Sequence, residues 1–469
     1  MNRYKKLCAD TVILALGTFG SKLLVFLLMP LYTALLSPSE YSTAELISST
    51  ANLIMPFACM GITTGIFRFA AEKGSNKQEV FSSSMALLAM GLGALLTVGI
   101  PVFLVGTLKI ETLLVVLYVL MADLQAVCAQ YVRAKDRPKL FALQGIFNTL
   151  TTILFNLLFL LVFDLGVTGY VLSVIMGNFL TTCLLVVFAK LWRVLRFSCV
   201  KGTVIKELFR FSLPLVPTTI CWLITDLSDR YFVTAICGAD INGIYSAAYK
   251  LPTVVTLLSG IFMQAWQFSA VTEAADEEEC GRFYSKVFRG FLSLIFIGAA
   301  TLILLSKPLC RVLLNQAYFE AWRYMPTLLC AAAIEAVVSF LATVYLVKKK
   351  SMHSFLTAVA GTLLNVILNA VFIPHWNAFG AAIATFLGYF LVYVLRTADA
   401  PRLIRFRLYL PRQTANLLLL LLIAAVVTLQ IRGWIWIGCV LAAGVWALNF
   451  PTLWNTAKGL LRQRRTKNL

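Results

Sequence analysis

The sequence predicts an all-α integral membrane protein with about fourteen transmembrane helices. The chain has 469 residues, of which 60% are hydrophobic and only 13% are charged, and its mean hydropathy is +0.85. A single soluble core cannot bury that much apolar surface, so most of it must face lipid. A transmembrane helix needs about 20 apolar residues, and runs of this length follow one another along almost the whole chain.

The apolar runs and the polar segments between them define the predicted spans. These fall near residues 11–36, 43–67, 80–106, 112–132, 140–163, 167–189, 212–236, 242–270, 287–306, 324–347, 352–373, 378–397, 413–431 and 433–454. The first run follows a basic start, as in a signal peptide, but it continues to Leu36 without a small-residue cleavage site. We therefore expect it to be retained as the first span.

The distribution of Lys and Arg predicts the orientation of the spans. Eight alternate connections hold 32 of the 40 Lys and Arg residues, whereas the intervening connections hold five. The eight are the N-terminus, 68–77, 133–139, 190–210, 282–289, 348–350, 396–412 and 458–467. This is the positive-inside pattern, which predicts an even number of spans with both termini in the cytoplasm. Membrane topology thus accounts for the net charge of +19, and we expect no nucleic-acid partner.

Neither a metal site nor a cofactor is expected. The 11 Cys residues are scattered without a C-x-x-C pair, and His353 and His375 lie apart from Cys and carboxylate clusters. Isolated Cys residues in apolar spans behave as small core residues, and the ligand spacing of a structural zinc site is missing. The sequence also has no recognisable phosphate-binding glycine loop or catalytic triad, so we expect a transporter rather than an enzyme.

The two halves of the sequence resemble each other, which predicts a duplicated architecture. Matching positions recur at nearly constant spacing: Thr149, Thr152, Asn156, Gly169 and Gly177 with Thr362, Asn365, Asn369, Gly380 and Gly388. We expect an N-terminal lobe of six helices at 1–200 and a C-terminal lobe of six at 201–410, related by an axis along the membrane normal. Two extra helices and a basic cytoplasmic tail occupy 411–469. A chance match in Leu-rich helices is the alternative for any single pair.

Ionisable and polar residues inside the predicted spans are the candidate functional residues. A charge at the bilayer centre costs about 2.5–3.5 kcal/mol on insertion scales, so such a residue normally faces a cavity or a partner. We expect ten side chains to contact a substrate: Lys22, Glu45, Trp222, Asp226, Asp229, Arg230, Tyr249, Lys250, Gln264 and Gln267. Asp123 and Glu335 are further acidic residues within spans.

The cations among these candidates suit an anionic substrate. Lys22 and Lys250 have no acidic residue one helical turn away, so each needs a partner from another helix, water or an anionic ligand. Arg and Lys from segments 1, 7 and 8 would suit a phosphate group, with Arg binding in a bidentate manner. Mutual neutralisation is the alternative for these residues: Asp226 or Asp229 with Arg230 in one helix, and Glu45 or Asp123 with Lys22 across helices. For Asp226 and Arg230 an internal ion pair is an equally good interpretation.

Glycine and proline residues in segments 1 and 7 are the predicted hinges. These are Gly17, Gly20, Pro30, Pro214 and Pro217. A proline inside a helix removes a hydrogen bond and kinks the chain, which membranes tolerate where neighbours or water satisfy the freed carbonyl. Because both residues are common in membrane helices, an ordinary structural role is the alternative.

Three stretches resemble a known family. They are FGSKLLVFLLMPLYTALLSPSEYSTAEL (Phe19 to Leu46), SLPLVPTTICWLITDLSDRYFVTAICGADINGIYSAAYKLP (Ser212 to Pro252) and FMQAWQFSA (Phe262 to Ala270). They are similar to helices of the polysaccharide-export branch of the multidrug/oligosaccharidyl-lipid/polysaccharide (MOP) superfamily, the bacterial flippases of lipid-linked polysaccharide repeat units. Two positions depart from the family pattern: Ser42 replaces a usual Gly, and Ala34 stands where many members carry a basic residue.

The resemblance implies a MATE-like V of two six-helix lobes around a cavity that opens alternately to either side. It implies a flippase that moves an undecaprenyl-pyrophosphate-linked oligosaccharide from the inner to the outer leaflet of the bacterial plasma membrane, for cell-surface polysaccharide biosynthesis. The implied partners are this polyprenyl-pyrophosphate-linked glycan and membrane lipids, with a glycan polymerase or glycosyltransferases as candidate protein partners.

Other functions remain open alternatives. A cation-coupled exporter of drugs or other small molecules would use the same fold, as would a flippase of lipid II, the peptidoglycan precursor. A membrane-bound glycan polymerase or ligase would need a sizeable extracytoplasmic loop with catalytic residues. The longest such predicted connection, about Lys307 to Arg323, offers little room for one.

Overall fold

The protein is an all-helical membrane protein throughout the part of the chain that its structure describes. The structure is a computed structural model that describes residues 28–71, 76–105, 109–135, 137–213, 216–272, 277–348 and 350–466. Within these ranges no β-strand occurs, and ten helices are long and apolar enough to cross a membrane. The predicted fold class is therefore confirmed.

The ten candidate spans agree with the predicted segments once three differences are considered. One of them, Met352–Leu403, covers two predicted segments. Predicted segment 1 lies mostly outside the described residues. Predicted segment 2 is divided between two helices, and predicted segment 7 carries three charged residues. Neither therefore contains an uninterrupted apolar helix of the length that the ten candidate spans have.

The chain divides into two compact units, Met1–Leu227 and Ser228–Leu469. Unit 1 contains α2 (Met29–Leu35), α3 (Pro38–Ala58), α4 (Ile62–Ala71), α5 (Lys77–Val105), α6 (Lys109–Ala134), α7 (Pro138–Asn156), the π-helix η1 (Leu157–Val162), α8 (Gly166–Ala189), α9 (Leu191–Val194), the 3₁₀-helix η2 (Phe197–Cys199), α10 (Gly202–Ser212) and the start of α11 (Val216–Cys237). Unit 2 contains the end of α11, α12 (Ala239–Ala248), α13 (Lys250–Thr272), α14 (Glu277–Leu313), the 3₁₀-helix η4 (Gln316–Arg323), α15 (Met325–Val347), α16 (Ser351–Leu403), α17 (Leu410–Leu429) and α18 (Trp434–Thr466).

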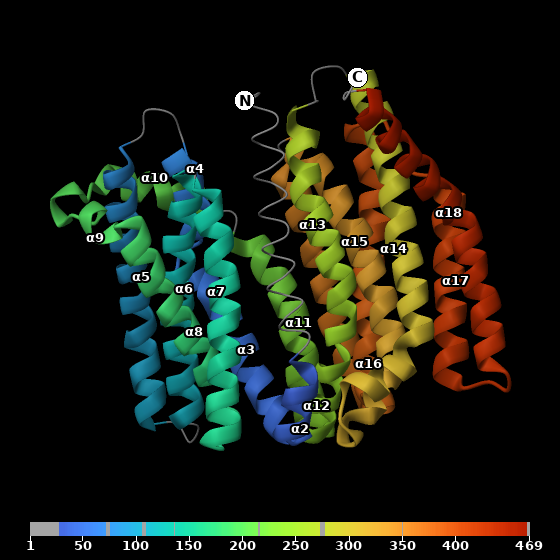
Figure 1. Ribbon diagram of the computed structural model, residues 1–469, viewed down its shortest axis with the longest axis horizontal. Coiled ribbons are helices and arrows are strands. Elements are labelled where there is room, and N and C mark those ends of the chain that lie inside the picture. Colours follow the sequence, from blue (N-terminus) through green and yellow to red (C-terminus); the bar gives the residue numbers. More distant parts are fainter. Residues whose placement is uncertain are drawn as a thin grey trace. The chain divides into compact units, whose positions relative to one another are not determined.

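Unit 1 is a bundle in which α6 is the central helix. It packs against α3, α4, α5, α7 and α8 (Figure 1), and the apolar core includes Phe81, Tyr131 and Leu208. The amphipathic α10 lies across the ends of α4 and α5, where Leu208 faces the core and Lys206 faces outward. The long apolar helices therefore form the bundle, and a short amphipathic helix covers one end of it.

Predicted segment 2 forms two helices because its backbone breaks after a proline. A capping box begins α3: the Ser37 side chain accepts from the Glu40 amide, and the Glu40 carboxylate accepts from the Ser37 amide. Pro56 lies in the last turn of α3, and Met60 and Gly61 then adopt positive φ angles of 49° and 68° before α4 begins. Such angles are unfavourable for a residue with a Cβ atom, so the chain is locally constrained at this break.

Unit 2 has α15 at its centre and two added helices at its side. Phe340 on α15 is in contact with aromatic rings from α13 and α14, including Trp266 at a centroid distance of 5.1 Å and Phe288 at 4.9 Å. The last two helices, α17 and α18, pack against each other and against α14 (Figure 1). They are thus part of unit 2 and close one of its sides.

The longest helix, α16, contains two spans joined by a sharp reversal. At about 1.5 Å per residue a straight helix of this length would be more than twice as long as the roughly 30 Å hydrocarbon layer is thick. The helix reverses at Asn377, whose φ of 52° and ψ of −146° are non-helical. Its two halves then meet where a Cβ atom on Gly361 would lie 2.3 Å from Val392 and 3.0 Å from the Gly388 carbonyl.

The two units contain equivalent helix contacts. A Cβ atom on Gly177 would lie 2.3 Å from Thr152, and one on Gly388 would lie 3.1 Å from the Cβ of Asn365. These are the glycine and polar positions that match between the two halves of the sequence. In the same way, Gly169 approaches Phe159 and Gly380 approaches Phe372. The internal repeat is therefore present in the packing as well as in the sequence.

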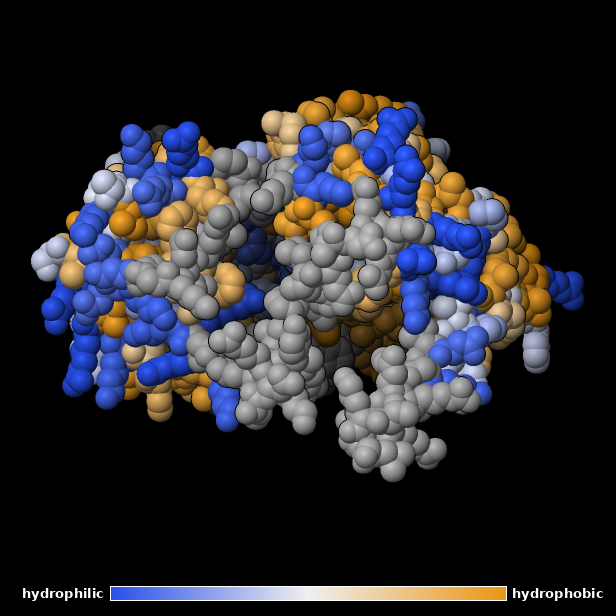
Figure 2. Space-filling model, turned by 90° about the horizontal axis from the view of Figure 1, so that it is seen from above, coloured by the Kyte–Doolittle hydropathy of each residue, from blue (hydrophilic) through white to orange (hydrophobic). Residues whose placement is uncertain are grey.

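Basic residues gather at one end of the helices in each unit, and Figure 2 shows hydrophilic side chains on this face. In unit 1 they belong to the connection after α8: Lys190, Arg193, Arg196, Lys201 and Lys206 are exposed. In unit 2, Arg282, Arg402, Arg405 and Arg407 line a cavity of about 770 Å³ between the start of α14 and the residues that follow α16. These segments are among the connections predicted to be cytoplasmic.

Candidate functional site

A buried carboxylate, Asp229 on α11, is the centre of a polar cluster in unit 2. The side chain is 0% exposed. Its oxygens accept hydrogen bonds from five side chains: the hydroxyls of Tyr245 (3.0 Å), Tyr249 (3.0 Å) and Thr385, and the amide groups of Asn365 (3.0 Å) and Asn369 (2.6 Å). The donors come from the C-terminal part of α12, from the residue that follows it and from both halves of α16, so the carboxylate joins these elements to α11.

The two oxygens of Asp229 have different partners. Oδ1 accepts from the amide nitrogens of Asn365 and Asn369, which can only donate, whereas Oδ2 contacts the hydroxyls of Tyr245, Tyr249 and Thr385. None of these five partners is a cationic side chain. The carboxyl group is thus enclosed by neutral polar groups of unit 2.

The oxygen atoms around Asp229 are of the type that hard cations take as ligands. In this arrangement N–H and O–H donors occupy the carboxylate oxygens, and the Ser228 hydroxyl donates to Asn365 at 3.0 Å. Across the described residues, no group of three or more His, Cys, Asp or Glu side chains has the geometry of a metal site. Both Asp229 oxygens are thus engaged in hydrogen bonds with described side chains.

A second buried carboxylate, Glu45 on α3, lies among tyrosines in unit 1. It is 5% exposed, and its Oε1 accepts from Tyr41 and from Tyr170, each at 3.1 Å. The ring of Tyr32 stands edge-on to that of Tyr170 at 4.8 Å, and Asn156 donates to the Tyr32 hydroxyl at 3.1 Å. Residues from α2, α3, α7 and α8 therefore meet around Glu45.

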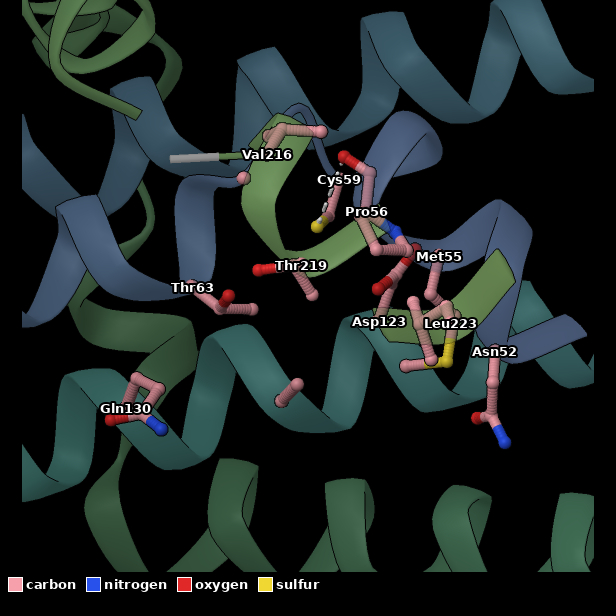
Figure 3. A pocket seen from close by; sticks show the side chains of 12 residues that line it. Asn52, Met55, Pro56, Cys59, Thr63, Asp123, Gln130, Val216, Thr219 and Leu223 are labelled. Carbon is pink, nitrogen blue, oxygen red and sulfur yellow. Dashed lines mark hydrogen bonds between the residues drawn. The ribbon is translucent and has the colours of Figure 1, made fainter. Parts of the chain in front are cut away.

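A third acidic residue, Asp123 on α6, lies beside a cavity of about 410 Å³ in unit 1. The cavity begins at the break between α3 and α4, and its polar lining also includes Asn52, Thr63, Gln130 and Thr219. In Figure 3, Asn52 and Gln130 lie toward opposite ends of the cavity, and Asp123 lies near Pro56 and Leu223. Asp123 is 1% exposed, and neither of its carboxylate oxygens has a hydrogen-bond partner.

Comparison with known proteins identifies the family. The family model described as "Polysaccharide biosynthesis protein" matches residues 7–267, which is more than half of the chain. The chain belongs to this family. None of the curated proteins matches it.

The fold of this polysaccharide biosynthesis family member is similar to solved membrane transporters. One is titled lipid II flippase MurJ in an inward closed conformation; it is 14% identical, with a TM-score of 0.70, covering 95% of this chain and 99% of that one. Inward-facing and outward-facing MATE multidrug transporters of the MOP superfamily have TM-scores of 0.66 and 0.61 and identities of 12% and 14%. They cover 81% and 84% of this chain, and 95% of each of those chains. The family model therefore confirms the predicted resemblance to a polysaccharide family, and the solved structures show that the fold is shared.

The structure of this family member places some predicted substrate residues together and separates others. Asp229 and Tyr249 are in contact. Arg230 and Lys250 are half-buried, on α11 and at the first residue of α13, while Asp226 is exposed although it lies only three residues from Asp229. Trp222 is half-buried on α11, Gln267 is exposed on α13, and Glu45 belongs to the tyrosine cluster of unit 1.

Several predicted residues fall outside the part that the structure describes. These are Gly17, Gly20, Lys22 and Pro214, together with the side chain of Gln264. The two other predicted hinge residues begin helices: Pro30 is in the first turn of α2, and Pro217 is the second residue of α11. A proline in the first turn has no intrahelical bond to break.

The structure adds residues to the site that were not among the predicted substrate contacts. Asn365 and Asn369 were visible only as members of the internal repeat. Tyr245 and Thr385 carried no sequence signal beyond their polarity within a span. The signal for Asp123 was its charge in an apolar helix, because a lone carboxylate in a span needs an explanation.

Proposed function

We propose that this protein is a flippase that moves an undecaprenyl-pyrophosphate-linked oligosaccharide from the inner to the outer leaflet of the bacterial plasma membrane. In this proposal it works by alternating access, has both termini in the cytoplasm and catalyses no covalent chemistry. Its partners are the lipid-linked glycan and the surrounding lipids, and a glycan polymerase or glycosyltransferases act with it in cell-surface polysaccharide biosynthesis.

The observation that carries this proposal is family membership combined with the fold. The family model matches 7–267, and the fold is shared along 95% of the chain with a protein titled a lipid II flippase. A polysaccharide biosynthesis protein with that fold is best explained by a role in moving the lipid-linked intermediate. Polysaccharide repeat units are large and polar, so they cannot cross the hydrocarbon layer unaided.

The proposed contacts to the substrate follow its chemistry. The pyrophosphate is anionic, so Lys22, Arg230 and Lys250 are proposed to bind it, with Asp226, Asp229 and Glu45 setting the local charge. Arg230 and Lys250 are half-buried, a degree of exposure at which a charge is screened less than at an open surface. The sugar hydroxyls are proposed to contact aromatic and amide side chains: Trp222, Tyr249, Gln264 and Gln267. Hinge motion is assigned to Gly17, Gly20, Pro30, Pro214 and Pro217.

The membrane potential would assist export of such a substrate. Moving one elementary charge across 100 mV changes its free energy by about 2.3 kcal/mol. A pyrophosphate with about two negative charges would therefore gain about 4.6 kcal/mol on moving outward in an inside-negative cell. That is roughly a 2,000-fold bias, since a factor of ten corresponds to about 1.4 kcal/mol.

The test is flipping of an undecaprenyl-pyrophosphate-linked oligosaccharide by the full chain in proteoliposomes, with and without an imposed potential. We expect flipping that accelerates when the potential is negative on the donor side. Arg230→Gln should slow it, because one proposed phosphate contact is lost, whereas the matched control Arg193→Gln removes an exposed charge from the connection after α8 and should not. Equal rates for Arg230→Gln and the unmodified protein would refute the proposed role of Arg230.

Two alternatives are decided by the same preparation. Flipping of lipid II in preference to the oligosaccharide would assign the protein to peptidoglycan precursor export. Export of amphipathic drugs against an ion gradient, without flipping of either lipid, would assign it to multidrug transport.

A further inference from the structure

The Asp123 carboxyl group has an environment that differs from those of the other two buried acids. Asp229 receives five hydrogen bonds and Glu45 receives two from tyrosines, whereas both Asp123 oxygens lack a hydrogen-bond partner and are inaccessible to water. An ionised carboxylate is stable in a low-dielectric interior only when donors or a counter-charge compensate for the loss of water. Within the described residues, the weak thiol donor of Cys59 is what lies beside Asp123, and no cationic side chain among them pairs with it.

The surroundings of Asp123 contain little that could stabilise a negative charge. Among the residues that line the cavity, the other titratable side chain is Cys59, and its thiol is directed to the Pro56 carbonyl at 3.9 Å. In α8, which packs on α6, the sequence has no Asp, Glu, Lys or Arg. In the other helices that pack on α6, the described charged residues lie in the first turns of α5 and α7 and on α3. They are Lys77, Glu79, Lys139, Glu40 and Glu45. The side chain of Arg68 on α4 is not among those described.

The break between α3 and α4 lies next to this carboxyl group. The cavity is lined by Pro56, Cys59 and Gly61, which belong to the break where α3 ends and α4 begins. Met60 and Gly61 have positive φ angles, so this connection is not a continuous helix and is a place at which two helices can change their angle. The cavity itself is polar on several sides and large enough for water.

We propose that Asp123 is a proton-binding site of unit 1, holding its proton in the present conformation and exchanging it with water through the adjacent cavity when the α3–α4 break changes its angle. The step involves only the carboxylate and water: an O–H bond forms on the carboxylate while one O–H bond of a hydronium ion breaks and leaves a water molecule, and release of the proton is the reverse. Of the small cations, a proton fits best because it needs no space beside oxygens that a water molecule does not reach. The site changes the charge of unit 1 by one when it empties.

Infrared spectroscopy of the full chain in nanodiscs at pH 7 tests this proposal. A protonated carboxyl group has a carbonyl band that is separate from the bands of ionised carboxylates. We expect such a band in the unmodified protein, and we expect Asp123→Asn to remove it. The matched control Asp240→Asn changes an exposed aspartate at the start of α12 and should leave the band unchanged.

A second variant keeps the test valid if Asp123→Asn does not fold. When the aspartates of the protein are labelled with ¹³C, the band of the protonated carboxyl group should shift. In labelled Asp123→Glu this shifted band should be absent, and the unlabelled glutamate at position 123 should give an unshifted band instead. A protonated aspartate band that persists in Asp123→Asn or Asp123→Glu would overturn the assignment. So would its absence from the unmodified protein at pH 7. The measurement needs no transported substrate, so its outcome is independent of whether the protein flips a lipid-linked glycan.

Discussion

Removal of one donor from the Asp229 cluster should destabilise unit 2 by a predictable amount. Thr385→Val keeps the shape of the side chain but deletes a hydroxyl that donates to the buried carboxylate. A hydrogen bond to a charged group contributes about 1.5–3 kcal/mol. For a domain of 150–250 residues the melting temperature changes by about 2–4 °C per kcal/mol. Thr385→Val should therefore lower the melting temperature by about 3–12 °C.

The control for this prediction is the same substitution at a hydroxyl that has no partner. Thr428 lies on α17 in the same unit, and its buried Oγ1 makes no hydrogen bond. Thr428→Val should be neutral or slightly stabilising, because it removes an unsatisfied polar group. Thermal unfolding of the two purified variants in one detergent measures both effects. Equal melting temperatures for the two variants would show that the donors do not stabilise Asp229.

Two further perturbations test the packing of each unit. In unit 1, Gly91→Ala would place a Cβ atom 1.9 Å from the Ala58 carbonyl oxygen at the α3–α4 break. This overpacking should lower the free energy of unfolding by about 1–3 kcal/mol. A Cβ atom at Gly93 would have no neighbour within 4 Å, so Gly93→Ala should stabilise the protein by up to about 1 kcal/mol through helix propensity. Thermal unfolding measures both variants, and a lower melting temperature for Gly93→Ala than for Gly91→Ala would contradict this packing. In unit 2, Arg396→Met should cost more than about 2 kcal/mol, because it removes the hydrogen bonds that this buried guanidinium donates to Val338, Ser354 and Thr357. Arg402→Met at an exposed site should change stability by less than about 0.5 kcal/mol. Urea-dependent protease resistance measures this second pair, and similar losses for both arginines would refute the assigned role of Arg396.

The spans and the repeat could be predicted because they depend on composition and spacing alone. Apolar runs of fixed length follow from the thickness of the bilayer, and the matched Asn and Gly positions follow from contacts that both units retain. The ionisable residues on α3, α6 and α11 were also visible, because a charge in an apolar helix is rare.

The side to which each residue points could not be obtained in the same way. Asp226 and Asp229 are three residues apart on α11 and were predicted to share a face, yet one is exposed and the other is buried by α16. That difference depends on helices more than 130 residues further along the chain. Arg396 shows a similar limit: it was counted with a basic cytoplasmic connection, but it is 2% exposed and donates to Thr357, Val338 and Ser354. Net charge and position determine topology, whereas burial depends on packing.

The reversal of α16 at Asn377 has a consequence for how antibodies and proteases meet this protein. Three other connections lie at the same end of unit 2 (Figure 1): Gly238, η4 and the turn at Gln430 to Gly433. Two of the four are continuous with helices or packed, since α16 reverses without a loop and η4 buries Tyr318 and Trp322. Antibodies to linear epitopes and proteases need exposed, flexible chain. These two connections have no long loop to offer them, so an epitope tag inserted at either would disturb the helices that it joins.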